Sequence, residues 1–180
     1  MQGLKFKIAF VLIFFVITSE LRAQMEPPFL LPGVAATYSS NLETTGINAR
    51  VYYGIDHTYC FGPEISYFRK SHEDNEVSLF EANANLHYII DLNKGLGFYP
   101  LTGINYTIET KIENQGFEEE KFSENSFGLN IGAGFHYTVG RILFFTEYKY
   151  VISTLEDHFF TAGALLNFSL AKKGGSKQHN

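Results

Sequence analysis

The chain has 180 residues, a formal net charge of −5, and 18 phenylalanines and 11 tyrosines but no tryptophan. This length fits one domain, and an acidic pI of about 5.7 gives no reason to expect a nucleic-acid partner. The mean hydropathy of −0.06 is too low for a helical membrane protein. It fits a soluble β-protein or a membrane barrel in which apolar and polar residues alternate. The single cysteine, Cys60, excludes an internal disulfide framework.

The first 23 residues have the features of a cleaved secretory signal peptide. Lys5 and Lys7 precede an apolar run at residues 8–17, and Ala23 is a suitable last residue before cleavage. A membrane anchor is the weaker alternative, because a spanning helix needs about 20 apolar residues. Residues 24–32 are expected to form a proline-broken lead-in, residues 33–170 the folded domain, and residues 171–180 a flexible tail.

Eight segments of the domain alternate between apolar and polar residues with period two, which predicts eight β-strands. The last one, residues 159–170, shows the pattern most clearly, since every second residue from Phe160 to Leu170 is apolar. The predicted strands span residues 34–40, 46–55, 58–69, 76–90, 96–109, 125–139, 141–152 and 159–170. We expect them to close into an antiparallel up-and-down barrel.

Two patterns favour a membrane barrel over a soluble one. The apolar face of the eight strands carries no His, Asp, Glu, Lys or Arg. Lipid excludes charge at mid-depth, whereas a soluble barrel needs charge outside. The connections also alternate in length, with tight turns at residues 56–57, 91–95 and Gly140 and polar loops at residues 70–75 and 110–124. Outer-membrane barrels combine short periplasmic turns with long external loops, so both chain ends are expected in the periplasm.

Two prolines conflict with this pattern. Pro63 and Pro100 fall inside predicted strands, yet a closed barrel has no edge strand in which a missing N–H is harmless. We expect a bulge or a strand start at each of them.

The polar face is expected to line a lumen that side chains fill, because eight strands leave little more room than that. Its ionisable members are predicted to form a paired network, since unpaired burial of charge is costly. They are Arg50, Glu64, Glu81, His87, His136, Glu147 and Lys149. The alternative is a conductive path that opens when this network rearranges. A metal site is not expected, because the two histidines lie among amides and carboxylates without clustering.

The second external loop is strongly acidic. It contains Glu113, Glu118, Glu119, Glu120 and Glu124 against Lys111 and Lys121. Such a charge run is usually a solvated surface, and its functional interpretation is contact with cations or with a basic partner at the cell surface.

Enzymatic activity on lipid is a separate question, because an acyl hydrolase would need a nucleophile close to a histidine and an orienting partner. The sequence shows no such motif, so the chain is not expected to be an enzyme.

Four stretches of the sequence resemble a known family. They are GINARVYYGIDHTYCFGPEISYF, LTGINYT, GLNIGAGFHYTVGRILFFTEYKYVIS and HFFTAGALLNFSL. They are similar to the small eight-stranded outer-membrane β-barrel proteins of Gram-negative bacteria, the OmpA/OmpX-like or porin-family barrels common in Bacteroidetes. The resemblance implies outer-membrane lipid, lipopolysaccharide and the barrel-assembly machinery as partners, and a monomer. It also implies an assembly signal at Thr161, Gly163, Leu166 and Phe168. The tail is too short for a peptidoglycan-binding domain.

The sequence therefore predicts an integral outer-membrane barrel with a structural or surface-interaction role, a lumen plugged by side chains, and no cofactor or metal. A narrow passive pore and a lipid-modifying enzyme are the alternatives.

Overall fold

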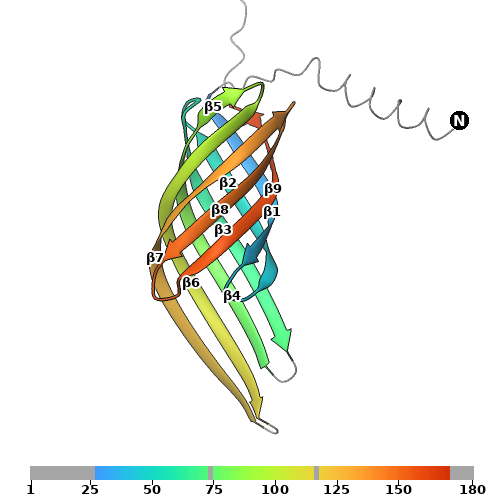
Figure 1. Ribbon diagram of the computed structural model, residues 1–180, viewed down its shortest axis with the longest axis vertical. Coiled ribbons are helices and arrows are strands. Elements are labelled where there is room, and N and C mark those ends of the chain that lie inside the picture. Colours follow the sequence, from blue (N-terminus) through green and yellow to red (C-terminus); the bar gives the residue numbers. More distant parts are fainter. Residues whose placement is uncertain (1–26, 73–74, 116–117, 171–180) are drawn as a thin grey trace, which may run out of the picture.

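The computed structural model describes residues 27–72, 75–115 and 118–170. In this part of the chain the strands form a closed antiparallel barrel (Figure 1). Its wall consists of β1 (Phe29–Ser39), β2 (Thr44–Gly54), β3 (Tyr59–His72), β4 (Asn75–Tyr88), β6 (Leu96–Gln115), β7 (Glu118–Val139), β8 (Ile142–Ile152) and β9 (Asp157–Leu166). Two short strands, β5 (Ile90–Asn93) and β10 (Phe168–Ser169), follow β4 and β9. The predicted signal peptide and tail lie outside the described residues.

Each wall strand pairs with its sequence neighbour, and β9 pairs with β1 to close the ring. The closing ladder runs from Gly33 opposite Leu165 to Ser39 opposite Phe159, which confirms the predicted eight-stranded barrel. The first strand begins at Phe29, earlier than expected, so residues 29–32 belong to the wall and not to the lead-in. They pair with β2 over their whole length. No helix among the described residues is long and apolar enough to cross a membrane.

The prolines interrupt the ladders without shifting them. Opposite Pro63, the β2–β3 pairing stops after Arg50–Glu64 and resumes in the same register at Tyr53–Phe61. Opposite Pro100, the pairing with β6 stops after His87–Leu101 and resumes, also in register, at Ile90–Phe98. The expected bulges and strand starts are therefore wrong. Loss of one N–H removes a ladder bond, and the neighbouring pairs hold the register.

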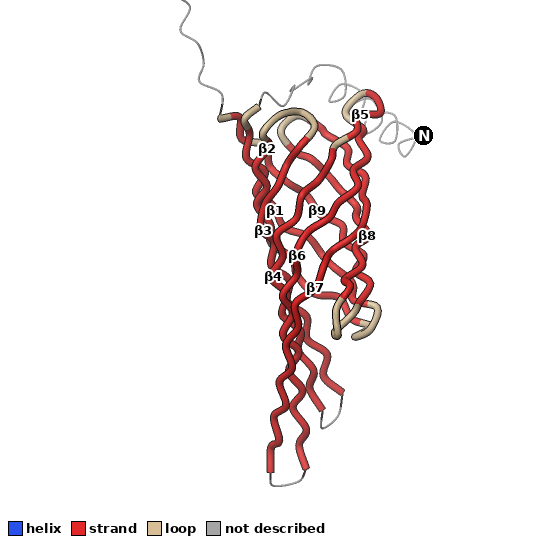
Figure 2. Tube along the Cα trace, turned by 90° about the vertical axis from the view of Figure 1, so that its left-hand side faces the viewer, coloured by secondary structure: helices blue, strands red, loops and turns tan. Residues whose placement is uncertain are grey.

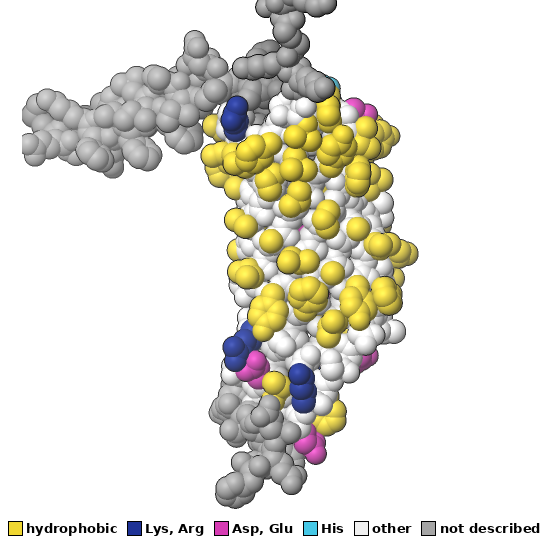
Figure 3. Space-filling view, turned by 180° about the vertical axis from the view of Figure 1, so that it is seen from behind, with side chains coloured by type: hydrophobic (Ala, Val, Ile, Leu, Met, Phe, Trp, Pro, Cys, Tyr) yellow, Lys and Arg dark blue, Asp and Glu magenta, His cyan; other side chains and the backbone are white. Residues whose placement is uncertain are grey.

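Side chains along each strand point alternately into the barrel and out of it. In β2, for example, buried and exposed residues alternate from Gly46 to Tyr52. The outward apolar side chains form a belt, and those at least half exposed include Val34, Ile47, Ile65, Ile104, Leu129 and Ile131. On the face shown in Figure 3, hydrophobic side chains cover the barrel and charged ones gather toward its ends. A soluble monomer rarely exposes so much contiguous apolar surface, whereas lipid favours it.

The two ends of the barrel differ. One has short turns, and the described part of the chain begins and ends there, where the Leu170 N–H donates to the Pro28 carbonyl at 2.8 Å. The turn between β2 and β3 is held by Asp56, whose carboxylate accepts from the N–H groups of Tyr59 and Thr58, both at 2.7 Å. These two bonds lower the pKa of the Asp56 carboxyl.

At the other end, β3, β4, β6 and β7 continue far beyond the barrel (Figures 1 and 2). The pairing of β3 with β2 ends at Tyr67, and that of β7 with β8 begins only at Leu129. The three ladders between β3, β4, β6 and β7 run on past these points. Their last pairs are His72–Asn75, Asn75–Glu113 and Gln115–Glu118. We call this extension the projecting sheet (residues 68–72, 75–79, 108–115 and 118–128). Residues 70–75 and 110–124 are thus mainly paired strand and not the expected loops. Their polar composition hid the pairing.

If the apolar belt faces lipid, Ala49→Arg will destabilise the barrel by about 2–4 kcal/mol, the cost of an arginine at mid-depth. Ala49 is exposed between Val34 and Ile65 on the neighbouring strands. Urea unfolding of the protein in lipid vesicles measures this change. Ser71→Arg, on the exposed end of β3, is the control and should change stability by less than about 0.5 kcal/mol. Equal effects of the two substitutions would contradict a lipid-facing belt.

Candidate functional site

Five charged side chains meet in the middle of the lumen, and we call them the ionic network. Arg50 comes from β2, Glu64 from β3, Glu81 from β4, and Glu147 and Lys149 from β8; none is more than 3% exposed. The Arg50 guanidinium lies 3.1 Å from both Glu64 Oε2 and Glu147 Oε2. Lys149 Nζ lies 2.9 Å from Glu64 Oε1 and 3.7 Å from Glu81 Oε2. Because Arg50 and Glu147 lie on strands that are not neighbours, the network links opposite walls of the barrel.

Neutral donors supplement these ion pairs. The Tyr52 hydroxyl donates to Glu64 Oε2 at 3.2 Å, and the Tyr99 hydroxyl to Glu147 Oε2 at 3.1 Å. The His87 ring lies between the rings of these two tyrosines, with centroid distances of 4.3 and 4.6 Å, and its Nε2 is 4.0 Å from Glu147 Oε2. Such donors matter because buried carboxylates remain costly unless hydrogen bonds add to the ion pairs.

An amide cluster continues the network toward β6 and β7. Asn130 Nδ2 donates to Asn83 Oδ1 at 3.0 Å and to Asn85 Oδ1 at 2.7 Å. Asn105 Nδ2 donates to Asn83 Oδ1 at 2.8 Å and to Glu81 Oε1 at 2.9 Å. The inward side chains of β4, β6 and β7 are therefore connected by hydrogen bonds to the charged centre.

Apolar clusters lie on both sides of the ionic network. The inward residues of β8 show the order, which is Leu143, Phe145, Glu147, Lys149 and Val151. The cluster toward the short-turn end, the inner cluster, contains Phe29, Leu31, Tyr52, Cys60, Leu143, Phe145 and Leu165. The outer cluster lies at the base of the projecting sheet, from which Phe68 and Leu79 come, and it also contains Val151 and Phe159. The two cations contact these clusters, with Arg50 4.4 Å above the Phe145 ring and Lys149 5.1 Å above the Phe159 ring.

The structure brings six of the seven predicted lumen residues together. His136, the seventh, is also buried but lies closer to the short-turn end, where its ring stacks on Tyr99 at 6.0 Å between centroids.

The structure also positions the four residues of the predicted assembly signal. Thr161 points inward and bonds to the Thr37 hydroxyl at 2.8 Å, Gly163 lies against β1, and Leu166 and Phe168 are exposed on the outside. Their role in assembly stays a prediction.

Sequence reasoning missed some polar contacts. Tyr52 and Tyr99 fall on the predicted inward face, but their spacing gave no sign that they would donate to Glu64 and Glu147. The expectation that the outward face of the strands carries no histidine is wrong. The strand β9 begins at Asp157, which puts His158 in register with the outward Phe160. Its Nδ1 lies 2.8 Å from the Tyr148 hydroxyl, near the projecting end of the wall.

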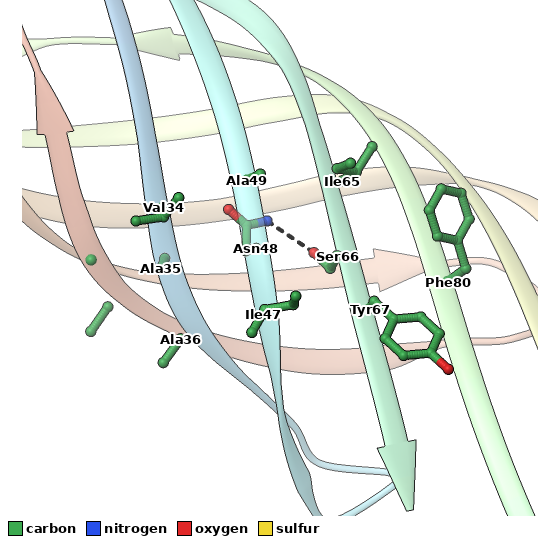
Figure 4. Close-up of a pocket in the computed structure, with 12 residues that line it drawn as sticks. Val34, Ala35, Ala36, Ile47, Asn48, Ala49, Ile65, Ser66, Tyr67 and Phe80 are labelled. Carbon is green, nitrogen blue, oxygen red and sulfur yellow. Dashed lines mark hydrogen bonds between the residues drawn. The ribbon is translucent and has the colours of Figure 1, made fainter.

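The outer surface also has an apolar hollow of about 530 Å³ above β1, β2, β3 and β9 (Figure 4). Its lining includes Ala36, Ala49 and Ala162 between the larger side chains of Ile47 and Tyr67. Behind it, inside the wall, Asn48 Nδ2 donates to Ser66 Oγ at 2.9 Å. The hollow is continuous with the belt, and the side chains that line it from outside are apolar or aromatic.

The network and a surface ion pair should respond differently to the same substitution. Arg50→Met leaves Glu64 and Glu147 buried without their shared cation, and it should destabilise the barrel by about 3–5 kcal/mol in urea unfolding. Arg69→Met removes an exposed pair with Glu76 that is even shorter, 2.6 Å, and should cost less than about 1 kcal/mol. Similar costs for both would show that the network contributes no more than a surface pair.

Neither a protein-family model nor a curated protein matches the sequence. Among solved structures, the chain is similar to a major outer membrane protein from Thermus thermophilus (10% identity, 78% of this chain and 99% of that chain, TM-score 0.66). It is also similar to OprG from Pseudomonas aeruginosa (13% identity, 83% of this chain and 99% of that chain, TM-score 0.59). A third is Ail, the attachment invasion locus protein of Yersinia pestis, in complex with the heparin analogue sucrose octasulfate (14%, 78% and 97%, 0.58). At such identities the similarity concerns the fold. The apolar belt agrees with an outer-membrane location, and the chain is an eight-stranded β-barrel with the fold of the small outer-membrane proteins.

Proposed function

We propose that this chain is an integral outer-membrane protein whose lumen is closed to ions and whose projecting sheet binds a basic partner outside the cell. The observation that carries the first half is the position of the ionic network between two apolar clusters. The apolar belt would contact outer-membrane lipid and lipopolysaccharide. The short turns and both chain ends would then face the periplasm, as in other barrels of this type.

An ion that crossed the barrel would meet three successive barriers. It would have to shed water at the inner cluster, displace side chains that are joined by four contacts of 2.9–3.7 Å, and pass the outer cluster. Apolar constrictions block ions by excluding water, and each of the five charged groups of the ionic network lies within 4 Å of a group of opposite sign. These features support a closed lumen over a narrow passive pore.

The closed lumen predicts that the purified protein gives no discrete current steps in planar lipid bilayers. A porin with 16 strands, which encloses an aqueous channel, is the positive control in the same bilayers. Gel mobility of boiled and unboiled samples checks that the inserted protein is folded. Reproducible steps from the folded protein would overturn this half of the proposal and favour the narrow pore.

The second half rests on one face of the projecting sheet. Following the alternation from the buried Asn105 and Thr107, this face carries Glu109, Lys111 and Glu113 on β6 and Glu120, Phe122 and Glu124 on β7. We call it the acidic face. Glu109 lies directly opposite Glu124, and Glu113 directly opposite Glu120. Like charges at directly opposed positions are destabilising. Lys111 Nζ relieves the first pair through its contact with Glu109 Oε1 at 2.6 Å. It also attracts Glu113 at longer range, but no cation among the described residues forms an ion pair with Glu113 or Glu120.

The lack of an ion pair at Glu113 and Glu120 supports a cationic partner over a purely solvated surface. A basic segment that lay along the acidic face would gain attraction and remove repulsion between the two glutamates. The outer edge of β7 is also without a neighbouring strand over residues 118–125, so an extended segment could pair with the backbone there. Phe122, 52% exposed on the same face, offers apolar contact to such a segment.

The double variant Glu113→Gln/Glu120→Gln should bind a short oligolysine peptide roughly three- to tenfold more weakly than the wild type. Fluorescence anisotropy with the protein in detergent micelles at low salt measures this, and the difference should vanish at about 1 M salt, where the Debye length is near 3 Å. The control is Asp91→Asn/Glu156→Gln, which removes the same two charges from exposed positions outside the projecting sheet, in β5 and in the β8–β9 loop. If this control weakened binding equally, net charge and not the acidic face would be responsible.

A further inference from the structure

The ionic network does not balance its own charge. It contains three carboxylates (Glu64, Glu81 and Glu147) and two cations (Arg50 and Lys149), all buried. A buried charge without compensation is strongly unfavourable, and such a group takes up or releases a proton instead. We propose that the lumen has a proton-binding site at Glu81, whose side chain is the neutral acid at neutral pH. This inference holds whether or not the barrel conducts.

The donors around each carboxylate point to Glu81 as the proton carrier. In Glu64, one oxygen contacts the Arg50 guanidinium and accepts a hydrogen bond from the Tyr52 hydroxyl, and the other contacts the Lys149 ammonium group. Glu147 receives Arg50 and Tyr99 on Oε2. Glu81 receives one neutral hydrogen bond, from Asn105 to its Oε1.

Two carboxylate oxygens of the network, Glu147 Oε1 and Glu81 Oε2, have no hydrogen-bond partner among the described residues. Glu147 accepts hydrogen bonds from Arg50 and Tyr99 through its other oxygen. Glu81, which is 0% exposed, accepts only from the neutral Asn105 and has no comparable donor for Oε2. The nearest cation, Lys149, is 3.7 Å from this oxygen but 0.8 Å closer to Glu64, at 2.9 Å. Lys149 is therefore shared between two carboxylates and bonds directly to only one of them. A proton on Glu81 removes the charge that the network leaves uncompensated.

The other strands that face Glu81 add negative charge. Glu64 on β3 and Asp157 on β9 both act on its charge, against Lys149 alone on β8. The directly opposed residues, Ser66 on β3 and Thr107 on β6, are neutral. Leu79, two residues away on the same face, belongs to the outer cluster. Asp157 needs no proton, because Ser39 Oγ and the N–H groups of Asn41 and His158 donate to its carboxylate.

His87 is the competing position for the missing positive charge. Its Nε2 also has no hydrogen-bond partner in the described part of the chain, and at 4.0 Å from Glu147 Oε2 it is beyond hydrogen-bond distance. Glu147, Glu64, Arg50 and His136 act on its charge, while the Tyr99 ring stacks on its ring and the Tyr52 ring packs against it at a tilt of 41°. The Arg50 guanidinium already neutralises Glu147 and repels a second cation there, so the geometry favours Glu81.

Infrared spectroscopy of the folded protein in micelles of a detergent that has no ester carbonyl group tests the assignment. At neutral pH the wild type should show the carbonyl-stretch band of a protonated carboxylic acid, and Glu81→Gln should lack it. The control, Glu76→Gln, is on the same strand, where its carboxylate pairs with exposed Arg69, and it should keep the band. Absence of the band in the wild type would overturn the proposal. A band that persisted in Glu81→Gln would assign the proton to another group.

The pH dependence of unfolding provides an independent readout. A folded state that holds one more proton than the unfolded chain loses stability as pH rises, by about tenfold in the folded-to-unfolded ratio per pH unit. This slope should be present between the normal titration range of a glutamate and neutral pH in the wild type and in Glu76→Gln. It should be absent in Glu81→Gln, which should refold normally because glutamine resembles the neutral acid in shape. Parallel profiles for all three proteins would contradict the site.

Discussion

The rest of this structure depends on the pairing of β9 with β1. In a lipid environment every backbone N–H and C=O must find a partner inside the protein, so a sheet that spans the membrane must close on itself. Gly33 and Gly163 allow the two strands to approach closely. A Cβ atom at Gly33 would lie 2.3 Å from the Ala164 carbonyl oxygen, and one at Gly163 2.4 Å from the Val34 carbonyl oxygen. Once the ring is closed, side chains can point only inward or outward, which makes strict alternation a requirement for the whole wall.

Ring closure with eight strands also determines what the interior can hold. Eight strands leave an interior that side chains can fill, and here the charged side chains lie in its middle with apolar clusters on both sides. Arg50 joins β2 to β3 and, across the lumen, to β8, and Lys149 joins β8 to β3 and β4. A network with so many specific partners disfavours any register other than the observed one, since a shift by one residue would turn these charges toward lipid.

The sequence predicted the parts of the fold that a two-residue period can encode. These were the eight strands, the apolar outer belt and six residues that do meet in the lumen. It could not predict the partner of each charge, because the Tyr52 and Tyr99 contacts depend on which strands face one another across the barrel. It also missed the projecting sheet. Strands outside the membrane have no apolar face, so pairs such as Lys111–Phe122 leave no periodic signal.

The acidic composition of the projecting sheet could reflect protection of a free strand edge as well as binding of a cationic partner. The register of the strands distinguishes these two explanations. Free strand edges invite unwanted pairing, and proteins often protect them with charge; β7 carries Glu120, Lys121 and Glu124 along such an edge. Edge protection, however, requires charge only on the edge strand. It does not account for Glu113, which lies on the interior strand β6, paired with β4 on one side and β7 on the other. Placed directly opposite Glu120, Glu113 costs stability without protecting any edge. A cation supplied from outside the chain would remove that cost, which supports the proposed role of the acidic face in binding over edge protection alone.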